Sequence, residues 1–200
     1  MNIGIMGGTF DPVHIGHLVA AEEARQQYDL EKVIFIPAGF PPHKEGTAIS
    51  RAEDRYLMTV LAVTNNPFFE VSRYEIDKNK PSFTIETIRH FYREMGEKKH
   101  IFFITGADAI LEILTWKDYK ELLDTCSFIA ASRPGYSLKE IRETIEPFYP
   151  GVLEKVHLLE NPAMAVSSTF IRERVALGKT IKYLTANAVE QYIYKRKLYV

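Results

Sequence analysis

Short runs of apolar residues alternate along the chain with stretches in which apolar positions recur every three or four residues. The continuous runs predict strands at 3–6, 33–36, 68–71, 101–105, 128–131 and 156–159. The helical spacing predicts helices at 15–28, 51–64, 84–95, 107–114, 118–123, from 138 onward, at 167–177, and before the basic residues 195–197. Strands that are apolar on both faces are typical of parallel sheets covered by helices. We therefore expect an α/β fold with a doubly wound, mainly parallel sheet and helices on both faces.

No linker, repeat or change of composition divides the chain, so we expect a single domain over residues 1–200. Two serines mark predicted helix starts. Ser50 and Ser137 each precede a glutamate by three positions, at Glu53 and Glu140, which is the pattern of a capping box. Ser167 also stands at a predicted helix start, where a hydroxyl group is a common cap.

Ligands of such sheets bind at the carboxyl ends of the strands, so the loop after the first predicted strand draws attention. It reads Gly7-Gly8-Thr9-Phe10-Asp11-Pro12-Val13-His14-Ile15-Gly16-His17. The two glycines permit a tight turn and a close approach to a ligand, and backbone N–H groups there favour an anion. His14 and His17 are three residues apart at a helix start, so both rings can face one spot.

Two other interpretations of this loop stay open from the residues alone. The histidines can be incidental to an ordinary strand–turn–helix unit, or they can form a metal pair, for which Asp11 is the nearby third ligand. Two familiar motifs fail. Gly4, Gly7 and Gly8 do not form the dinucleotide pattern G-x-G-x-x-G, and residues 178–180 resemble the end of a P-loop but follow Glu173 where glycine is required.

Composition narrows the classes of protein further. The chain has 25 Lys and Arg against 26 Asp and Glu, a balance that disfavours general nucleic-acid binding. Cys126 is the single cysteine, which excludes an internal disulfide and a multi-cysteine metal site; we expect it to be an inert buried thiol inside a strand. No apolar run approaches the ~20 residues of a membrane span, and the first residues lack a basic signal region. We expect a cytoplasmic protein.

With Gly8-Thr9-Phe10-Asp11-Pro12 followed by His14-Ile15-Gly16-His17, the chain resembles the (T/H)xGH nucleotidyltransferase superfamily. Members of that superfamily join an adenylyl or cytidylyl group to a phosphorylated acceptor. Further segments resemble the bacterial nicotinate-nucleotide adenylyltransferase family, in that family's order: 41–44, 81–84, 106–108, Trp116, 132–135 and 167–172. The resemblance implies a Rossmann-like fold and the reaction of ATP with nicotinate mononucleotide to give nicotinate adenine dinucleotide and pyrophosphate.

The same resemblance implies roles for individual residues. It makes His14, His17, Lys44 and Arg172 catalytic through contacts with the phosphates of ATP. Further ATP contacts are implied for Gly7, Gly8, Thr9, Phe10, Gly106, Asp108, Ser167 and Ser168. A pyridine nucleotide pocket is implied for Thr84, Trp116 and Lys117. Without the resemblance, Lys44 reads as a solvated lysine, Ser167 to Arg172 as an ordinary capped helix, Asp108 as a helix-start acid and Trp116 as a core residue.

The attacking phosphate is already largely ionised at neutral pH, so we expect direct in-line displacement without a general base or a covalent enzyme intermediate. Mg²⁺ is expected to bind mainly through the phosphates of ATP, with no protein metal ligands assigned. Two rival functions remain: the same chemistry with another phosphorylated acceptor, and a nucleotide-binding regulator without catalysis. We expect small-molecule substrates, no nucleic-acid or membrane partner, and an oligomeric state that is open, a homo-oligomer included.

Overall fold

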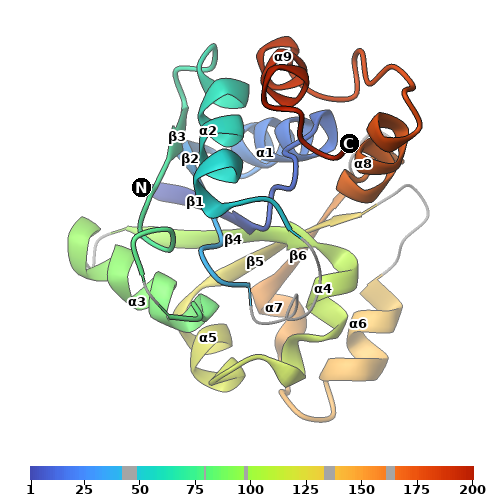
Figure 1. Cartoon of the computed structure of the whole chain (residues 1–200). Helices are drawn as coiled ribbons and strands as arrows, with labels where there is room; N and C mark the ends of the chain where they lie inside the picture. Colours follow the sequence, from blue (N-terminus) through green and yellow to red (C-terminus); the bar gives the residue numbers. More distant parts are fainter. Residues whose placement is uncertain (42–48, 79, 97–98, 133–137, 161–164) are drawn as a thin grey trace. The chain divides into compact units, whose positions relative to one another are not determined.

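A computed structural model of the chain describes residues 1–41, 49–78, 80–96, 99–132, 138–160 and 165–200. Its six strands are β1 (Asn2–Gly8), β2 (Leu30–Pro37), β3 (Phe69–Val71), β4 (His100–Gly106), β5 (Ser127–Ser132) and β6 (Val156–Glu160). They form one sheet in the order β3-β2-β1-β4-β5-β6 (Figure 1). β1 pairs with β4, β4 with β5 and β5 with β6, all in parallel. The order reverses between β1 and β4, as in doubly wound sheets, so the predicted α/β fold is confirmed.

The helices follow the predicted periodicity closely. They are α1 (Ile15–Gln27), α2 (Ala52–Val63), α3 (Thr84–Met95), α4 (Ala107–Leu111), the 3-10 turn η2 (Ile113–Thr115), α5 (Tyr119–Thr125), α6 (Leu138–Ile145), α7 (Val152–Lys155), α8 (Ser168–Ala176) and α9 (Asn187–Arg196). The four-residue helix α7 was not predicted, because one turn is too short to show a period.

The chain forms two compact units. The first comprises Met1–Gly7, Ala20–Ile34 and Phe83–Ala163, and the second comprises Gly8–Val19, Phe35–Ser82 and Met164–Val200. The single domain over residues 1–200 stays a prediction.

The first unit is built around β1, β4, β5 and β6. Most of their paired residues are apolar, and Ile3, Ile101, Phe128 and Val156 are all at most 1% exposed. A continuous apolar strand of this kind is stable only where helices cover both faces, which explains why these strands were legible in the sequence.

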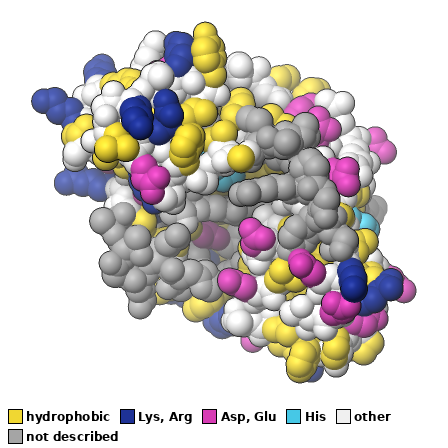
Figure 2. All heavy atoms as spheres, turned by 90° about the vertical axis from the view of Figure 1, so that its right-hand side faces the viewer, with side chains coloured by type: hydrophobic (Ala, Val, Ile, Leu, Met, Phe, Trp, Pro, Cys, Tyr) yellow, Lys and Arg dark blue, Asp and Glu magenta, His cyan; other side chains and the backbone are white. Residues whose placement is uncertain are grey.

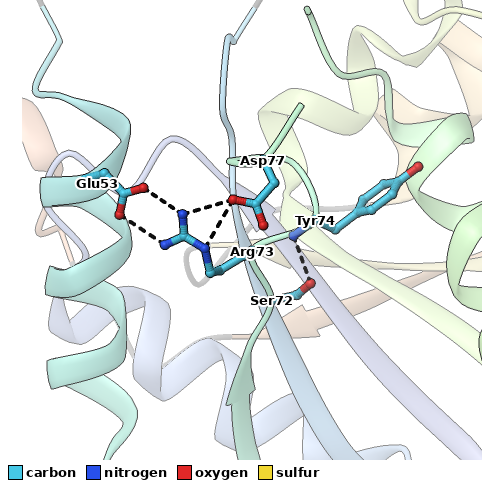
Figure 3. Close-up of polar contacts among 5 residues, drawn as sticks. All are labelled: Glu53, Ser72, Arg73, Tyr74 and Asp77. Atoms are coloured by element: carbon cyan, nitrogen blue, oxygen red, sulfur yellow. Dashed lines mark hydrogen bonds and ion pairs between the residues drawn. The ribbon is translucent and has the colours of Figure 1, made fainter. Parts of the chain in front are cut away.

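The second unit is held together by polar contacts as well as by apolar packing. Tyr192 of α9 donates a hydrogen bond to Asp54 of α2 over 2.7 Å. Arg73, which follows β3, forms ion pairs with Glu53 of α2 at 2.6 Å and with Asp77 at 2.9 Å (Figure 3). These contacts fix the turn after β3 against the side of α2.

The helix caps correct one prediction and confirm another. α2 begins at Ala52 with Arg51 in the capping position and no side-chain cap, so the predicted Ser50 capping box is wrong. The Ser50 amide instead donates a hydrogen bond to the carboxylate of Asp11 over 3.3 Å, which removes Ser50 from the helix start. Ser167 does cap α8, accepting a hydrogen bond from the Phe170 amide over 3.1 Å. Ser137 lies outside the described residues.

Cys126 lies at the end of α5, one residue before β5, and not inside a strand as predicted. Its thiol is buried, as expected, and donates to the Leu122 carbonyl oxygen over 3.5 Å. Burial raises the pKa of the Cys126 thiol to about 12. The thiol therefore stays protonated and unreactive at neutral pH.

Candidate functional site

The first loop belongs to the second unit from Gly8 onward, and its bend lies later than the sequence suggested. Gly7 and Gly8 are the last residues of β1, so the predicted glycine turn is wrong. The chain changes direction at Phe10, which has a φ of 51° and is 2% exposed. A Cβ atom on Gly8 would lie 2.8 Å from the Phe10 ring. Glycine is required at this position because the buried ring folds back against the strand end.

The two histidines of the loop lie side by side, which agrees with the expectation from their spacing that both rings can face one spot. Their rings stack with centroids 3.7 Å apart, and the Phe10 and His17 rings pack in a T-shaped arrangement with centroids 5.1 Å apart. The backbone N–H of His14 donates to Nδ1 of His17 over 3.2 Å. An Nδ1 that accepts a hydrogen bond cannot carry a proton, so the proton of a neutral His17 lies on Nε2. His17 is thereby prepared to donate from one defined atom.

Both rings are uncharged at neutral pH. Burial lowers the pKa of His14 to about 4. Burial, and then the neighbouring His14, hold the pKa of His17 well below its usual range. Within the part of the chain that the structure describes, the buried Nδ1 of His14 has no hydrogen-bond partner. Buried polar atoms are normally paired, so this atom marks a place where a ligand group is expected.

Helix α8 meets the first loop at its N-terminal end. The Ser168 hydroxyl donates to the Pro12 carbonyl oxygen over 2.8 Å. Nη1 of Arg172 donates to the carbonyl oxygen of Asp11 over 2.7 Å, and Nη2 donates to the Thr169 hydroxyl over 3.2 Å. The helix start also carries the positive end of its dipole. Two segments that are more than 150 residues apart in sequence are thus fixed side by side.

A pocket of about 250 Å³ lies between these two segments. It is lined by Thr9, Phe10, Asp11, His17, Ile49, Ser168, Thr169 and Arg172. Residues 167–182 carry four basic side chains and one acidic side chain. On the face shown in Figure 2, Lys and Arg side chains gather in the upper part, where α8 and α9 lie. The lining and its surroundings therefore favour a phosphorylated ligand.

A family model described as cytidylyltransferase-like matches residues 5–174. The chain is 55% identical to a probable nicotinate-nucleotide adenylyltransferase of Moorella thermoacetica over 98% of this chain and 91% of that protein. A protein of the same description from Thermoanaerobacter sp. is 54% identical over 100% of this chain and 94% of its own length. The chain belongs to the nicotinate-nucleotide adenylyltransferase family.

Solved structures agree on the fold of this adenylyltransferase family member. A nicotinic acid mononucleotide adenylyltransferase of Plasmodium falciparum, complexed with NaAD, superposes with a TM-score of 0.78 over 99% of this chain and 97% of that chain. Sequence identity is 19%, so this likeness supports the fold and carries no residue role.

The remaining predicted residues of the adenylyltransferase site belong mostly to the first unit. Gly106 ends β4 and Asp108 lies in the first turn of α4, both exposed. A Cβ atom on Gly106 would meet nothing within 4 Å, so open space lies beside it. Lys44 lies outside the described residues.

The predicted pyridine residues lie on two segments that one ion pair joins. Thr84 is the first residue of α3, and Lys117 follows Trp116 after η2. Nζ of Lys117 is 3.0 Å from a carboxylate oxygen of Glu86 and 4.5 Å from the centre of the Phe83 ring. Trp116 is half-buried and packs edge-on against Phe103, with ring centroids 6.1 Å apart. The Phe83 ring thus supports the Lys117 side chain.

Sequence reasoning missed Ile49 in the pocket lining, since an isolated apolar residue in a loop gives no signal. The metal-pair alternative finds no support in the described ranges, where no group of three His, Cys, Asp or Glu side chains is placed to hold a metal ion. Across those same ranges, no helix is both long and apolar enough to cross a membrane.

Proposed function

We propose that this chain transfers the adenylyl group of ATP to nicotinate mononucleotide, forming nicotinate adenine dinucleotide and pyrophosphate. The observation that carries the proposal is the pocket between the first loop and α8, lined by His17 and Arg172. Two uncharged imidazoles and one guanidinium suit a group whose phosphates already bring negative charge. Membership of the nicotinate-nucleotide adenylyltransferase family, at 55% identity to a relative of that description, supports the choice of reaction.

The chemistry requires positioning and charge stabilisation more than proton transfer. The phosphate of nicotinate mononucleotide is the nucleophile, and its second pKa of about 6 leaves it largely ionised at neutral pH. It attacks the α-phosphorus of ATP in line with the bond to the departing pyrophosphate, so charge grows on the leaving oxygen. Nε2–H of His17 donates to that developing charge. His14 supports this hydrogen bond through its stacked ring and through its Nδ1, which has no partner among the described residues.

Arg172 supplies the positive charge at the other side of the pocket. A guanidinium has five N–H donors, and the bonds to Asp11 and Thr169 occupy one each on Nη1 and Nη2. Among the described residues no side chain or carbonyl group occupies the remaining donors, which can bind phosphate oxygens. Because Nη1 is anchored on the first loop, the charge is fixed before ATP binds, and no reorganisation is needed in the transition state.

Mg²⁺ is proposed to arrive with ATP. It prefers phosphate and water oxygens, and the carboxylate that lines the pocket, Asp11, already accepts hydrogen bonds from Tyr199 and the Ser50 amide. Arg55, buried nearby, adds a positive charge that disfavours a cation at that carboxylate. These contacts fit an ion carried by the triphosphate, where it neutralises charge, and assign it no protein ligand.

For the acceptor, we propose that Trp116 stacks on the pyridine ring and that Thr84 and Lys117 meet its carboxylate. Their support is the ion pair between Lys117 and Glu86, which joins the segment after η2 to the start of α3. A cation at this place favours nicotinate over the uncharged nicotinamide. Gly106 and Asp108 are proposed to face the adenosine, since open space lies beside Gly106.

The experiment compares acceptors on the purified protein with ATP and Mg²⁺. Pyrophosphate release should be faster with nicotinate mononucleotide than with nicotinamide mononucleotide at equal concentration. An equal or reversed preference contradicts the acceptor assignment. Pyrophosphate release with phosphopantetheine or a sugar phosphate instead would favour the same chemistry with another phosphorylated acceptor. ATP binding without turnover on any acceptor would favour a regulator. The proposal also includes a cytoplasmic location, a single domain and the absence of nucleic-acid partners. It assigns no oligomeric state.

A further inference from the structure

Arg55 of α2 is a fully buried arginine that the proposed reaction does not use. Its side chain is 0% exposed. Nη1 donates to the Thr9 carbonyl oxygen over 2.7 Å, Nη2 to that of Gly39 over 3.1 Å, and Nε to that of Ser50 over 3.1 Å. One side chain therefore fixes the backbone of the first loop, of the loop after β2 and of the segment before α2. A buried cation is retained only where a partner offsets its charge.

Asp11 supplies that charge. Its side chain is 2% exposed, and both of its carboxylate oxygens are engaged. Oδ1 accepts a hydrogen bond from the Tyr199 hydroxyl over 2.7 Å, and Oδ2 accepts one from the Ser50 amide over 3.3 Å. Burial lowers the pKa of Arg55, and the negative charge of Asp11 counteracts this shift. Asp11 is also linked to the pocket through its backbone, because its carbonyl oxygen accepts a hydrogen bond from Arg172.

Tyr199 follows α9 and adopts an unfavourable backbone conformation. Its φ is 66°, in the left-handed region that costs a non-glycine residue about 1 kcal/mol or more. The preceding amide, that of Leu198, bonds to the Ile193 carbonyl oxygen of α9 over 3.0 Å. Burial, and then the charge of Asp11, raise the pKa of the Tyr199 hydroxyl, so it remains a donor at any working pH. The Asp11 contact offsets the strain that the backbone bears.

We propose that Tyr199 is a positioning residue of the active site, which acts by fixing the Asp11 carboxylate and, with Arg55, the backbone from Thr9 to Asp11. The inference rests on the proposed adenylyl transfer. Neither Tyr199 nor Arg55 is among the described residues that line the pocket, so neither touches substrate there. Their effect reaches the pocket through the loop that carries the histidines and anchors Arg172. A displacement of about 1 Å in such a loop can slow an enzyme about a hundredfold.

The test variant is Tyr199→Phe, which removes one hydroxyl group and keeps the ring. The matched control is Tyr192→Phe, since Tyr192 also donates over 2.7 Å to a carboxylate, that of Asp54, in the same unit. Among the described residues, Asp54 also pairs with Arg196 at 3.4 Å and has no hydrogen bond or ion pair with the first loop. Both variants lose a phenol–carboxylate hydrogen bond, and both should lower the thermal unfolding midpoint by a similar few degrees.

The two variants should differ in turnover. Tyr199→Phe is expected to lower kcat about tenfold, with KM for nicotinate mononucleotide within about twofold of the wild type. Tyr192→Phe should keep kcat within about twofold. Equal kcat values for the two variants would overturn the proposal, because they would assign Tyr199 a structural role alone.

A double-mutant cycle tests whether Tyr199 acts through Asp11. Asp11→Asn keeps the shape of the side chain and removes its charge. The double variant Tyr199→Phe/Asp11→Asn should be no more than about twofold slower than Asp11→Asn alone. If the loss of kcat in the double variant equals the product of the losses in the two single variants, the proposed route from Tyr199 through Asp11 is overturned. If Asp11→Asn does not fold, the comparison of Tyr199→Phe with Tyr192→Phe decides.

The imidazole nitrogens report on the loop without any turnover. In ¹⁵N spectra of the full chain, Tyr199→Phe should shift or broaden the signals of His14 and His17, whereas Tyr192→Phe should leave them unchanged. Unchanged histidine signals in Tyr199→Phe would overturn the positioning role. Absence of wild-type turnover with ATP and nicotinate mononucleotide would contradict the proposed reaction instead, and the spectra would still decide the structural claim.

Discussion

The first loop in the second unit and the Trp116–Lys117 segment in the first unit reach their positions by different means. Asp11 and His14 are 2% and 8% exposed, and Asp11 is hydrogen-bonded through both carboxylate oxygens. Lys117 is held by an ion pair whose two side chains are 44% and 22% exposed. Buried hydrogen bonds fix geometry, whereas exposed ion pairs contribute little and permit movement. The loop is therefore organised before substrate binds, whereas the Trp116–Lys117 segment, which we propose to meet the acceptor, can adapt to a ligand.

The largest effect is expected from removing a hydrogen-bond donor in the first loop. His17→Ala should lower kcat by about 10²–10³, since deletion of one preorganised donor to developing charge has that order of cost. KM for nicotinate mononucleotide should change by less than about threefold. The measurement is steady-state pyrophosphate release with both substrates varied.

His17→Gln is the informative companion to that variant, because an amide N–H can partly replace Nε2–H. Partial recovery of kcat in His17→Gln supports a donor role. A wild-type rate in His17→Ala would remove His17 from the mechanism and would end the contrast between the two regions.

The second prediction concerns the pH dependence of stability that the buried histidines impose. The pKa of His14 is about 4 in the folded protein and 6.5 in an unfolded chain. Between these values the unfolded chain binds a proton that the folded protein refuses, so stability falls as the pH drops from 6.5 towards 4. From pH 7 to pH 5 this single group should remove about 2 kcal/mol from the free energy of unfolding. Urea unfolding at the two pH values measures the difference.

The matched control is His14→Gln, which cannot take up a proton. Its loss of stability from pH 7 to pH 5 should be smaller than that of the wild type by about 2 kcal/mol. Burial also lowers the pKa of His100 and His157 in the first unit, but the wild type and His14→Gln both retain these two histidines. An identical loss in His14→Gln and the wild type would mean that the ring is solvated.

Features that depend on neighbouring residues could be predicted from the sequence better than features that depend on residues far apart in the chain. Local periodicity predicted the apolar strands. It also predicted α3, which is found at Thr84–Met95 as expected. The spacing of His14 and His17 likewise predicted that the two rings can face one spot, and the structure shows that they stack. The turn expected at Gly7 and Gly8 was misplaced, because the Phe10 ring that excludes a side chain at Gly8 reaches that place only through the fold.

Long-range polar contacts could not be predicted at all. The capping pattern at Ser50 was overridden because its amide is bonded to Asp11 in the folded chain. Arg55 and Tyr199 show no motif, since a buried arginine in a helix and a tyrosine near residue 200 look like surface residues in the sequence. Their partners lie 46 and 188 residues away, and only the tertiary fold brings them together.

The smallest expected effect lies on the adaptable side. Trp116→Phe keeps an aromatic ring beside Phe103 and reduces the surface for stacking on the acceptor. Loss of part of one aromatic stack costs about 0.5–1.5 kcal/mol, so KM for nicotinate mononucleotide should rise about two- to twelvefold. KM for ATP and kcat should stay within about twofold, and each serves as an internal control in the same kinetic series. If Trp116→Phe instead lowers kcat while KM for the acceptor is unchanged, Trp116 orients the reacting groups as firmly as the buried loop does, and the two regions do not differ as argued.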